Sequence, residues 1–337
     1  MRVAVLNGPG DLTVEERPEP HAAPGQVVVR IASVGVCGSD THYYDHGRIG
    51  RFVVEQPLVL GHEASGEVAE VGAGVTDLRV GQRVSLEPGV PDLVCVQCRA
   101  GRYNLCPDMR FFATPPVDGA FAELVAVHAA FAHPVPDTMS DDAAALLEPL
   151  SVGIWACRKG RVGAGSRVLV TGAGPIGLVS VQTALAFGAT SVVVSDVNPA
   201  RLQLALDLGA TEVVDARSDS VLDLERPPQV LLECSGFPPA IAEGVRALDR
   251  AGRAVLVGMG GDEVALPLSV VQERELELTG TFRYANTWPT AVDLVTAGRV
   301  DLDRLVTGTY DLADAAQALT ASRRDETAVK AVVRPGR

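Results

Sequence analysis

A cysteine and a histidine–glutamate pair form the first group of residues that could do chemistry. Cys37 opens the stretch CGSDTH, and His62 and Glu63 follow in the stretch GHEASG. Thiolate, imidazole and carboxylate groups are ligands that suit zinc, and three protein ligands leave a fourth position for water or substrate. We therefore expect an open zinc site, which could polarise an alcohol hydroxyl. Taken alone, Cys37 has an alternative interpretation as a buried, unreactive thiol.

A glycine-rich turn is the second such group. In the pattern G-x-G-x-x-G it contains Gly172, Gly174, Pro175, Ile176 and Gly177. An apolar strand-like run precedes the turn and a run with helical spacing follows it, which is the context of a dinucleotide-binding turn. The three glycines would permit the turn, let the backbone approach a pyrophosphate, and let helix and strand pack closely. The pyrophosphate would lie at the helix N-terminus, where unpaired N–H groups favour an anion.

An acidic residue beyond this turn indicates which coenzyme the turn would hold. Asp196 ends the next strand-like run, SVVVSD. A carboxylate there accepts hydrogen bonds from ribose hydroxyls and repels a 2′-phosphate, so we expect NAD rather than NADP. Arg201 could receive a 2′-phosphate, but we interpret it as packing along the adenine face. A strand-to-helix turn without a ligand is the alternative interpretation of the whole motif.

Two kinds of fold must position these residues. Up to about residue 130 the chain shows strand-like runs (26–36, 64–75 and 82–88) separated by Gly and Pro turns, which is typical of a strand-rich domain. From about residue 166, strand-like and helical runs alternate, which predicts an α/β fold with a doubly wound parallel sheet. Two helical runs, 288–300 and 312–323, end the chain.

These patterns predict two domains. Residues 1–150 and 283–337 are expected to form the strand-rich catalytic domain, and residues 151–282 the Rossmann domain.

Composition limits the partners of the chain. Its 337 residues carry a formal net charge of −13, and such a balance repels phosphate backbones and anionic membranes. We therefore expect neither nucleic acid nor a membrane as a partner. The N-terminus lacks a basic region followed by a long apolar run, so we expect no secretory signal and a cytoplasmic location. In that compartment the six cysteines should be metal ligands or buried thiols.

Several segments resemble one protein family, in order, over almost the whole chain. They are CGSDTHYYDHGRIG (37–50), GHEASG (61–66), AGRYNLCPDM (100–109), FFATPPVDGAF (111–121), LLEPLSVG (146–153), the glycine turn and TFRYANTW (281–288). The chain is similar to the zinc-containing medium-chain dehydrogenases, and within them to the sorbitol/xylitol (polyol) dehydrogenases. The resemblance implies a GroES-like first domain, a Rossmann second domain, a catalytic zinc and NAD.

The resemblance also implies roles for the residues of the zinc site. Cys37, His62 and Glu63 would ligate the catalytic zinc, and Glu148 would hold or replace the water bound there. Asp40 would accept a hydrogen bond that fixes the orientation of His62. Glu148 has the plainer alternative of simply beginning a helix.

The substrate residues rest on the same resemblance. Ser39 would contact the substrate oxygen and begin a proton relay, with His42 either the outlet to solvent or an ordinary surface histidine. The pocket would be formed by Tyr43, Phe111, Glu148, Arg283 and Tyr284. Arg283 and Tyr284 would reach into the cleft between the domains, or would hold the domains together as an interface pair. A charged arginine favours a polyhydroxylated substrate over a simple alcohol.

A second metal site departs from the family pattern. The family often carries a structural zinc on a lobe with four cysteines; here Cys95, Cys98 and Cys106 match the last three, but Asp92 stands at the first. Aspartate is a competent zinc ligand, so one aspartate with three cysteines could still hold the metal. We expect this second zinc. Three reduced thiols without metal are the alternative.

We therefore expect an NAD-dependent zinc enzyme that oxidises a secondary hydroxyl of a polyol, such as sorbitol or xylitol, to a ketose. The family suggests a homotetramer or homodimer. A zinc medium-chain dehydrogenase for an amino-alcohol, an aldose or an inositol-like ring would share nearly all of these motifs. A catalytically idle NAD-binding protein belongs to another class, and the presence of Ser39 and of all three predicted zinc ligands disfavours it.

Overall fold

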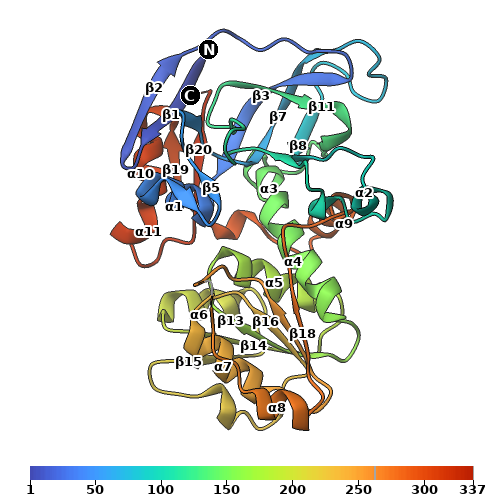
Figure 1. Cartoon of the computed structure of the whole chain (residues 1–337), viewed down its shortest axis with the longest axis vertical. Coiled ribbons are helices and arrows are strands. Elements are labelled where there is room, and N and C mark those ends of the chain that lie inside the picture. Colours follow the sequence, from blue (N-terminus) through green and yellow to red (C-terminus); the bar gives the residue numbers. More distant parts are fainter. Residues whose placement is uncertain (262, 337) are drawn as a thin grey trace. The chain divides into compact units, whose positions relative to one another are not determined.

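The structure consists of two compact units. The computed structural model describes residues 1–261 and 263–336. Unit 1 comprises Met1–Glu148 and Leu302–Arg337, and unit 2 comprises Pro149–Asp301. Figure 1 labels their helices and strands. Every helix in the described part of the chain is too short or too polar to cross a membrane.

A seven-stranded sheet forms the centre of unit 1. Its strands lie in the order β12-β8-β7-β3-β20-β19, and β11 also pairs with β3. The pairings are antiparallel except for β19 with β20, which is parallel. The strands are β3 (Gln26–Gly35), β7 (Glu63–Val71), β8 (Arg83–Leu86), β11 (Leu124–His128), β12 (Ala132–Pro134), β19 (Val306–Asp311) and β20 (Lys330–Arg334). Most of β3 is buried, as its run of valines and its central place in the sheet require.

Smaller elements surround this sheet. The short strands are β1 (Arg2–Gly8), β2 (Asp11–Glu16), β4 (Arg48–Ile49), β5 (Phe52–Val53), β6 (Leu58–Val59), β9 (Gly89–Val90) and β10 (Arg110–Phe111). The helices are α1 (Gly38–His46), α2 (Val96–Arg99), α3 (Asp141–Ala145), α10 (Ala315–Leu319) and α11 (Ala321–Arg324). The 3₁₀ turns are η1 (Tyr103–Leu105), η2 (Ala129–Phe131), η4 (Asp303–Leu305) and η5 (Leu312–Asp314). Strands β2, β1 and β6 form a separate three-stranded sheet, and one apolar core, which includes Leu6, Ile31 and Phe121, joins it to the main sheet.

Unit 2 is built on a six-stranded parallel sheet. Its strands lie in the order β15-β14-β13-β16-β17-β18, and every pairing is parallel. The strands are β13 (Arg167–Thr171), β14 (Ser191–Asp196), β15 (Glu212–Asp215), β16 (Val230–Glu233), β17 (Arg253–Leu256) and β18 (Glu277–Gly280). The strand order reverses direction between β13 and β16, which is the topology of a doubly wound sheet.

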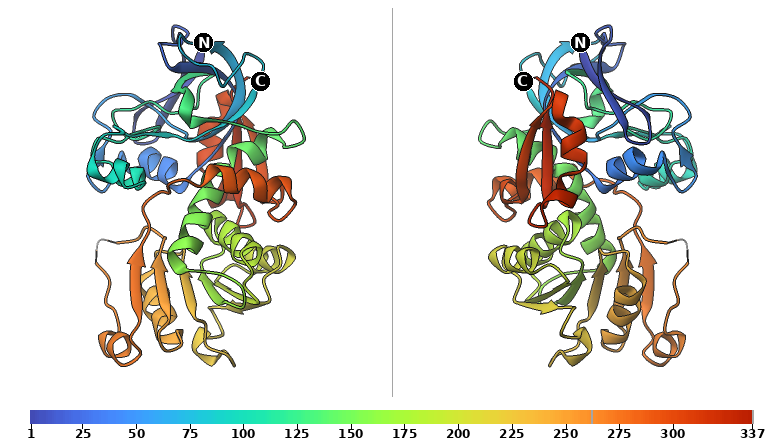
Figure 2. Two further views of the ribbon diagram at one scale, coloured as in Figure 1. Left: turned by 90° about the vertical axis from the view of Figure 1, so that its right-hand side faces the viewer. Right: turned by 90° about the vertical axis from the view of Figure 1, so that its left-hand side faces the viewer.

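Helices cover both faces of this parallel sheet (Figure 2). The helices of this part of the chain are α4 (Leu147–Gly160), α5 (Pro175–Ala186), α6 (Pro199–Asp207), α7 (Pro238–Ala247), α8 (Leu268–Glu273) and α9 (Trp288–Thr296), with the turn η3 (Val221–Asp223), and of these α5, α6 and α7 pack on the sheet. Right-handed crossovers that run in opposite directions from the centre of a sheet place their helices on opposite faces. The expected α/β fold class, with its Rossmann sheet and strand-rich GroES-like domain, is confirmed.

The boundary between the units lies later in the chain than position 282, where the sequence analysis placed it. Residues 283–301 pack with unit 2, where Trp288 of α9 is fully buried. The side chain of Gln182 donates to the backbone oxygen of Asp301 at 3.1 Å and accepts from its nitrogen at 2.7 Å. These contacts hold the segment after α9 against α5.

The C-terminal segment also differs from its prediction. The run 312–323, predicted as one helix, forms η5 followed by the short helices α10 and α11. The strands β19 and β20 were not predicted at all. Val332 of β20 pairs with Gly35 of β3, so this strand owes its place to a partner almost three hundred residues earlier in the chain.

Candidate metal centre and coenzyme site

Strand pairing brings the first group of candidate metal ligands together. The end of β3 lies beside the start of β7, with Gly35 opposite Glu63. Cys37 follows β3 at the N-cap of α1, and His62 precedes β7. One sulfur, nitrogen or oxygen atom of each of Cys37, His62 and Glu63 lies within 4.8 Å of the others. A thiol, an imidazole and a carboxylate at this separation fit one zinc ion with a further position left for another ligand.

Asp40 links the two loops that carry these ligands. This buried carboxylate accepts hydrogen bonds from the backbone N–H groups of Cys37 at 3.0 Å and Gly61 at 2.9 Å. Its Oδ1 also lies 3.6 Å from Nδ1 of His62. Burial opposes the charge of either group, but their attraction prevails, so the pKa of Asp40 is lowered and that of His62 is raised well above its ordinary value. Asp40 thus contacts His62 where the resemblance implied.

Lys330 lies against the same group of residues, and the sequence analysis missed it. Its Nζ is 2.8 Å from Oε1 and 2.9 Å from Oε2 of Glu63, and it donates to the backbone oxygen of Val36 at 2.9 Å. Burial disfavours the ammonium, but electrostatic attraction to Glu63 and Cys37 and hydrogen bonding to Glu63 overcome this, and the pKa of Lys330 is raised. The sequence offered one signal for Lys330, the rarity of lysine: the chain contains only one other, Lys159.

Five other predicted residues lie in unit 1 as well. Ser39 is half-buried and His42 exposed, both on α1, and the side chain of Tyr43 is buried in the core. Phe111 of β10 packs with its ring centroid 5.6 Å from that of His62, so it borders the candidate metal ligands. Glu148 is buried in the first turn of α4, and its charge contributes to the raised pKa of Lys330.

Arg283 and Tyr284 belong to unit 2. Both follow β18, and the ring of Tyr284 packs edge-on against that of Trp288 at a centroid separation of 5.3 Å. The Arg283 guanidinium lies over the ring of Phe282, 4.9 Å from its centroid, and the Arg283 backbone has a φ of 54°. The side chain of Arg283 is half-buried, and Tyr284 is buried.

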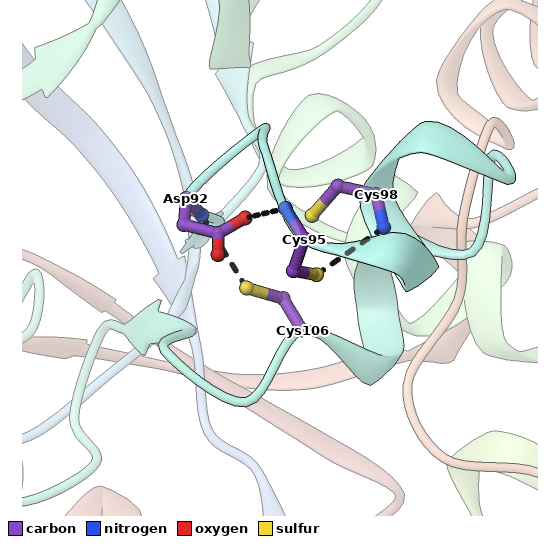
Figure 3. A group of neighbouring side chains, drawn as sticks. All are labelled: Asp92, Cys95, Cys98 and Cys106. Atoms are coloured by element: carbon purple, nitrogen blue, oxygen red, sulfur yellow. Dashed lines mark hydrogen bonds between the residues drawn. The ribbon is translucent and has the colours of Figure 1, made fainter.

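The second group of candidate ligands lies on the lobe that contains α2 and η1 (Figure 3). One ligand atom of each of Asp92, Cys95, Cys98 and Cys106 lies within 4.8 Å of the others. Oδ1 of Asp92 accepts from the backbone nitrogens of Val94 at 2.9 Å and Cys95 at 3.0 Å. The sulfur of Cys95 accepts from the nitrogen of Cys98 at 3.4 Å, and that of Cys106 from the nitrogen of Asp92 at 3.3 Å.

The pKa values of Asp92 and Cys98 in this lobe are shifted in opposite directions. Backbone hydrogen bonds from Cys95 and Val94 lower the pKa of Asp92 to about 2, so its carboxylate is charged at neutral pH. Desolvation, followed by hydrogen bonding with Cys95, Asp92 and Cys106, raises the pKa of Cys98 to about 12. A bound metal ion would provide the positive charge that a thiolate at Cys98 requires.

The glycine turn has the geometry of a dinucleotide site. Gly172 has a φ of 88°, which favours glycine, and its N–H donates to the backbone oxygen of Ser195 at 2.8 Å. A Cβ on Gly177 would lie 1.8 Å from the Gly172 oxygen, so only glycine permits this packing of α5 on β13. A Cβ on Gly174 would meet nothing within 4 Å, which leaves space for a ligand at the N-terminus of α5. Pro175 and Ile176 form the first turn of that helix.

Asp196 lies beside this turn, at the end of β14. Its Oδ2 accepts from the backbone nitrogen of Ala173 at 2.6 Å, and its Oδ1 from that of Asn198 at 2.8 Å. The turn and the carboxylate are therefore held together, as a site for a phosphate and a neighbouring ribose requires. Arg201 is half-buried in the first turn of α6, and its nitrogen donates to Asn198 at 3.1 Å.

A cavity lined by charged side chains lies elsewhere in unit 1. It has a volume of about 690 Å³ and is lined by charged side chains that include Arg83, Asp142 and Arg334. Both arginines form ion pairs at 2.6 Å, Arg83 with Asp141 and Arg334 with Asp142. None of the predicted site residues lines this cavity.

Known proteins resemble the chain over nearly its whole length. A family model for the alcohol dehydrogenase GroES-like domain matches residues 23–137, and one for zinc-binding dehydrogenases matches residues 175–297. Sorbitol dehydrogenase of Gallus gallus is 44% identical, over 96% of this chain and 93% of that protein. The Homo sapiens enzyme is 44% identical, over 93% and 90%. The structure of L-idonate 5-dehydrogenase from Escherichia coli matches with a TM-score of 0.93 at 32% identity, over 99% of this chain and 98% of the other.

Proposed function

The chain belongs to the zinc-dependent medium-chain dehydrogenases, in the branch of the polyol dehydrogenases, and from this we propose that it oxidises a secondary hydroxyl of a polyol, such as sorbitol or xylitol, to a ketose with NAD. The proposal rests on one observation above all. Cys37, His62 and Glu63 converge in a chain that also carries an intact dinucleotide turn. Together these residues would hold the two groups that hydride transfer from an alcohol needs, a zinc ion and NAD.

The residues around the metal centre would have different roles. Cys37, His62 and Glu63 would hold the zinc, Asp40 would orient His62, and Glu148 would hold or replace the water bound there. When bound, the zinc supplies the Lewis acidity that lowers the pKa of an alcohol hydroxyl, and NAD supplies the hydride acceptor. The chain itself supplies the route for the proton.

Ser39 and His42 are suited to carry that proton. They stand three residues apart on α1, so they lie on the same face of the helix. The half-buried Ser39 hydroxyl would accept the proton of the substrate and pass one on, and the exposed His42 imidazole would release a proton to water. This relay keeps charge from accumulating beside the metal.

The substrate residues are proposed from chemistry and resemblance together. Phe111 borders the metal ligands and would limit the shape of the substrate, while Tyr43 and Glu148 would bind hydroxyls. Arg283 and Tyr284 are proposed as further hydroxyl-binding residues. A guanidinium and a phenol favour a polyol over an alkyl alcohol, since each donates to hydroxyl oxygens.

Asp196 supports NAD as the coenzyme. Its carboxylate beside the turn would accept from ribose hydroxyls and would repel a 2′-phosphate. Gly172, Gly174, Pro175, Ile176 and Gly177 would bind the pyrophosphate at the N-terminus of α5. Arg201 would pack along the adenine.

A structural zinc on the lobe of Asp92, Cys95, Cys98 and Cys106 is part of the same proposal. We also propose a homodimer or homotetramer in the cytoplasm. In the part of the chain that the structure describes, β18 pairs only with β17, and Leu266, Leu268 and Phe282 around it expose apolar surface. Such an edge commonly pairs with another chain. Light scattering after gel filtration measures the assembly.

Initial rates test the proposed function. We expect NADH release with sorbitol, xylitol, ribitol or arabinitol, and much slower release with an amino-alcohol, an aldose or inositol. Faster turnover of an amino-alcohol, an aldose or inositol would indicate a zinc dehydrogenase with that substrate. If no alcohol caused NADH release, a catalytically idle NAD-binding protein would be favoured. Cys37→Ser should abolish turnover and zinc binding at this centre while leaving NADH binding intact; a fully active variant would refute the zinc role.

A further inference from the structure

The ammonium group of Lys330 binds the carboxylate of Glu63. The ammonium has three N–H donors, and three oxygens receive them: both carboxylate oxygens of Glu63 and the backbone oxygen of Val36. Both side chains are buried, at 3% exposure for Lys330 and 1% for Glu63. A buried charge requires this degree of pairing, because desolvation alone would disfavour it strongly.

The residue type at position 330 is informative in this chain. Arginine provides 27 of the 29 basic side chains, and lysine only two. Lys330 is therefore an exception to a strong preference for arginine. A compact ammonium can satisfy two carboxylate oxygens and a backbone oxygen from a single atom, whereas a planar guanidinium cannot.

The backbone of Gly35 also lies against the Glu63 carboxylate. A Cβ on Gly35 would lie 2.1 Å from Oε2 of Glu63, so the carboxylate packs directly against the backbone of β3. The carboxylate therefore contacts both the Gly35 backbone and the Lys330 ammonium, and both contacts limit its movement. Cys37 and Glu148 also attract the Lys330 ammonium electrostatically.

We propose that Lys330 is a positioning residue of the zinc centre, which fixes the Glu63 carboxylate beside Cys37 and His62 and carries part of its charge. The inference rests on the proposed catalytic zinc. Two consequences follow. Glu63 keeps a counter-charge when the metal is removed, so the metal-free protein stays folded. Glu63 also donates less charge to a bound metal than an unpaired carboxylate would.

Lys330→Met tests the first consequence through thermal unfolding, with and without zinc. The variant leaves Glu63 buried with the metal as its only counter-charge. We expect the melting temperature of the metal-free protein to fall by roughly 10 °C or more, and that of the zinc-loaded protein by less than half as much. Lys159→Met, which removes the other lysine, is the matched control and should change neither value. An equal loss in both forms would overturn the proposal, because it would make Lys330 merely a core residue.

Cobalt substitution tests the second consequence by spectroscopy. The visible bands of Co²⁺ bound at this centre report its ligands, so Lys330→Met should change their position or intensity while Lys159→Met leaves them unchanged. On a Glu63→Gln background, Lys330→Met should cause no further change, since Lys330 acts through Glu63. Spectra of wild type and Lys330→Met that superimpose would overturn the proposal.

Two controls keep the result unambiguous. Should Lys330→Met aggregate, the double variant Glu63→Gln/Lys330→Met decides: removal of both charges should restore a folded protein, and continued aggregation would overturn the proposal. Elemental analysis of the wild type, compared with Cys37→Ser, separates the two levels of inference. If the wild type holds no zinc that depends on Cys37, the proposed function is wrong. If it holds that zinc but Lys330→Met changes neither the melting temperature nor the cobalt spectrum, only the proposed role of Lys330 is wrong.

Discussion

At the scale of single residues, Asp196 should decide between the two nicotinamide coenzymes. Asp196→Ala removes the carboxylate that would bind the ribose and repel a 2′-phosphate. We expect the KM for NAD to rise by about 10–100-fold, which is the usual effect of losing hydrogen bonds to a charged group. The KM for NADP should fall. Steady-state rates with both coenzymes measure the change, and an unaltered preference would contradict the assigned role.

Asp92 should decide the metal content of the lobe. Its carboxylate stands at the place where the family has a fourth cysteine, within 4.8 Å of the three thiols. We expect two zinc ions per chain in the wild type and in Asp92→Cys, but one in Asp92→Ala, because three thiolates without a fourth ligand hold zinc more weakly. Mass spectrometry of the metal-loaded proteins counts the ions. A wild type with a single zinc would show that the lobe is metal-free.

At the scale of elements, two substitutions in the turn between β13 and α5 should distinguish an effect on folding stability from an effect on coenzyme binding. Gly177→Ala forces a Cβ to within 1.8 Å of the Gly172 oxygen, so α5 must move away from β13. We expect the free energy of unfolding to fall by about 1–3 kcal/mol, the usual cost of overpacking, and NADH binding to weaken at the same time.

Gly174→Ala is the matched control at the same turn. Its Cβ would meet no atom within 4 Å, so the free energy of unfolding should change by less than about 1 kcal/mol. NADH binding should still weaken, because the methyl group enters the space above the helix N-terminus. Denaturant unfolding and NADH fluorescence titration measure both quantities. If Gly177→Ala and Gly174→Ala lowered the free energy of unfolding and the NADH affinity by the same amounts, the different roles given to these two glycines would be contradicted.

The elements also explain what the sequence could and could not predict. The parallel sheet was predictable because its signals are local: short apolar strands, the glycine turn, and helical spacing between them. Lys330–Arg334 was not, because a strand of five residues gains its stability from pairing with β3 and β19 rather than from its own pattern. The contact between Lys330 and Glu63 therefore required the structure. The family and fold are confirmed, whereas the individual roles of the site residues stay predictions.

At the scale of the whole molecule, each unit contains its own core and its own proposed ligand. The core cluster that includes Ile31 and Phe121 lies entirely in unit 1, and the one that includes Leu169 and Leu231 lies entirely in unit 2. Zinc is proposed to bind unit 1 and NAD unit 2. Local stability follows local contacts, so removal of one ligand should loosen mainly the unit that holds it.

Hydrogen exchange read by mass spectrometry tests this independence. After treatment with a chelator, we expect faster amide exchange in residues 35–46, 61–66 and 92–106, because the metal ligands in these segments lose the ion that joins them. The strands of the parallel sheet should exchange as before. NADH should instead slow exchange at residues 171–177 and in the first turn of α6, with little effect in unit 1. Chelator-induced exchange that rises equally through both units would contradict the independence of the two cores, since it would mean that zinc stabilises the molecule as a single cooperative body.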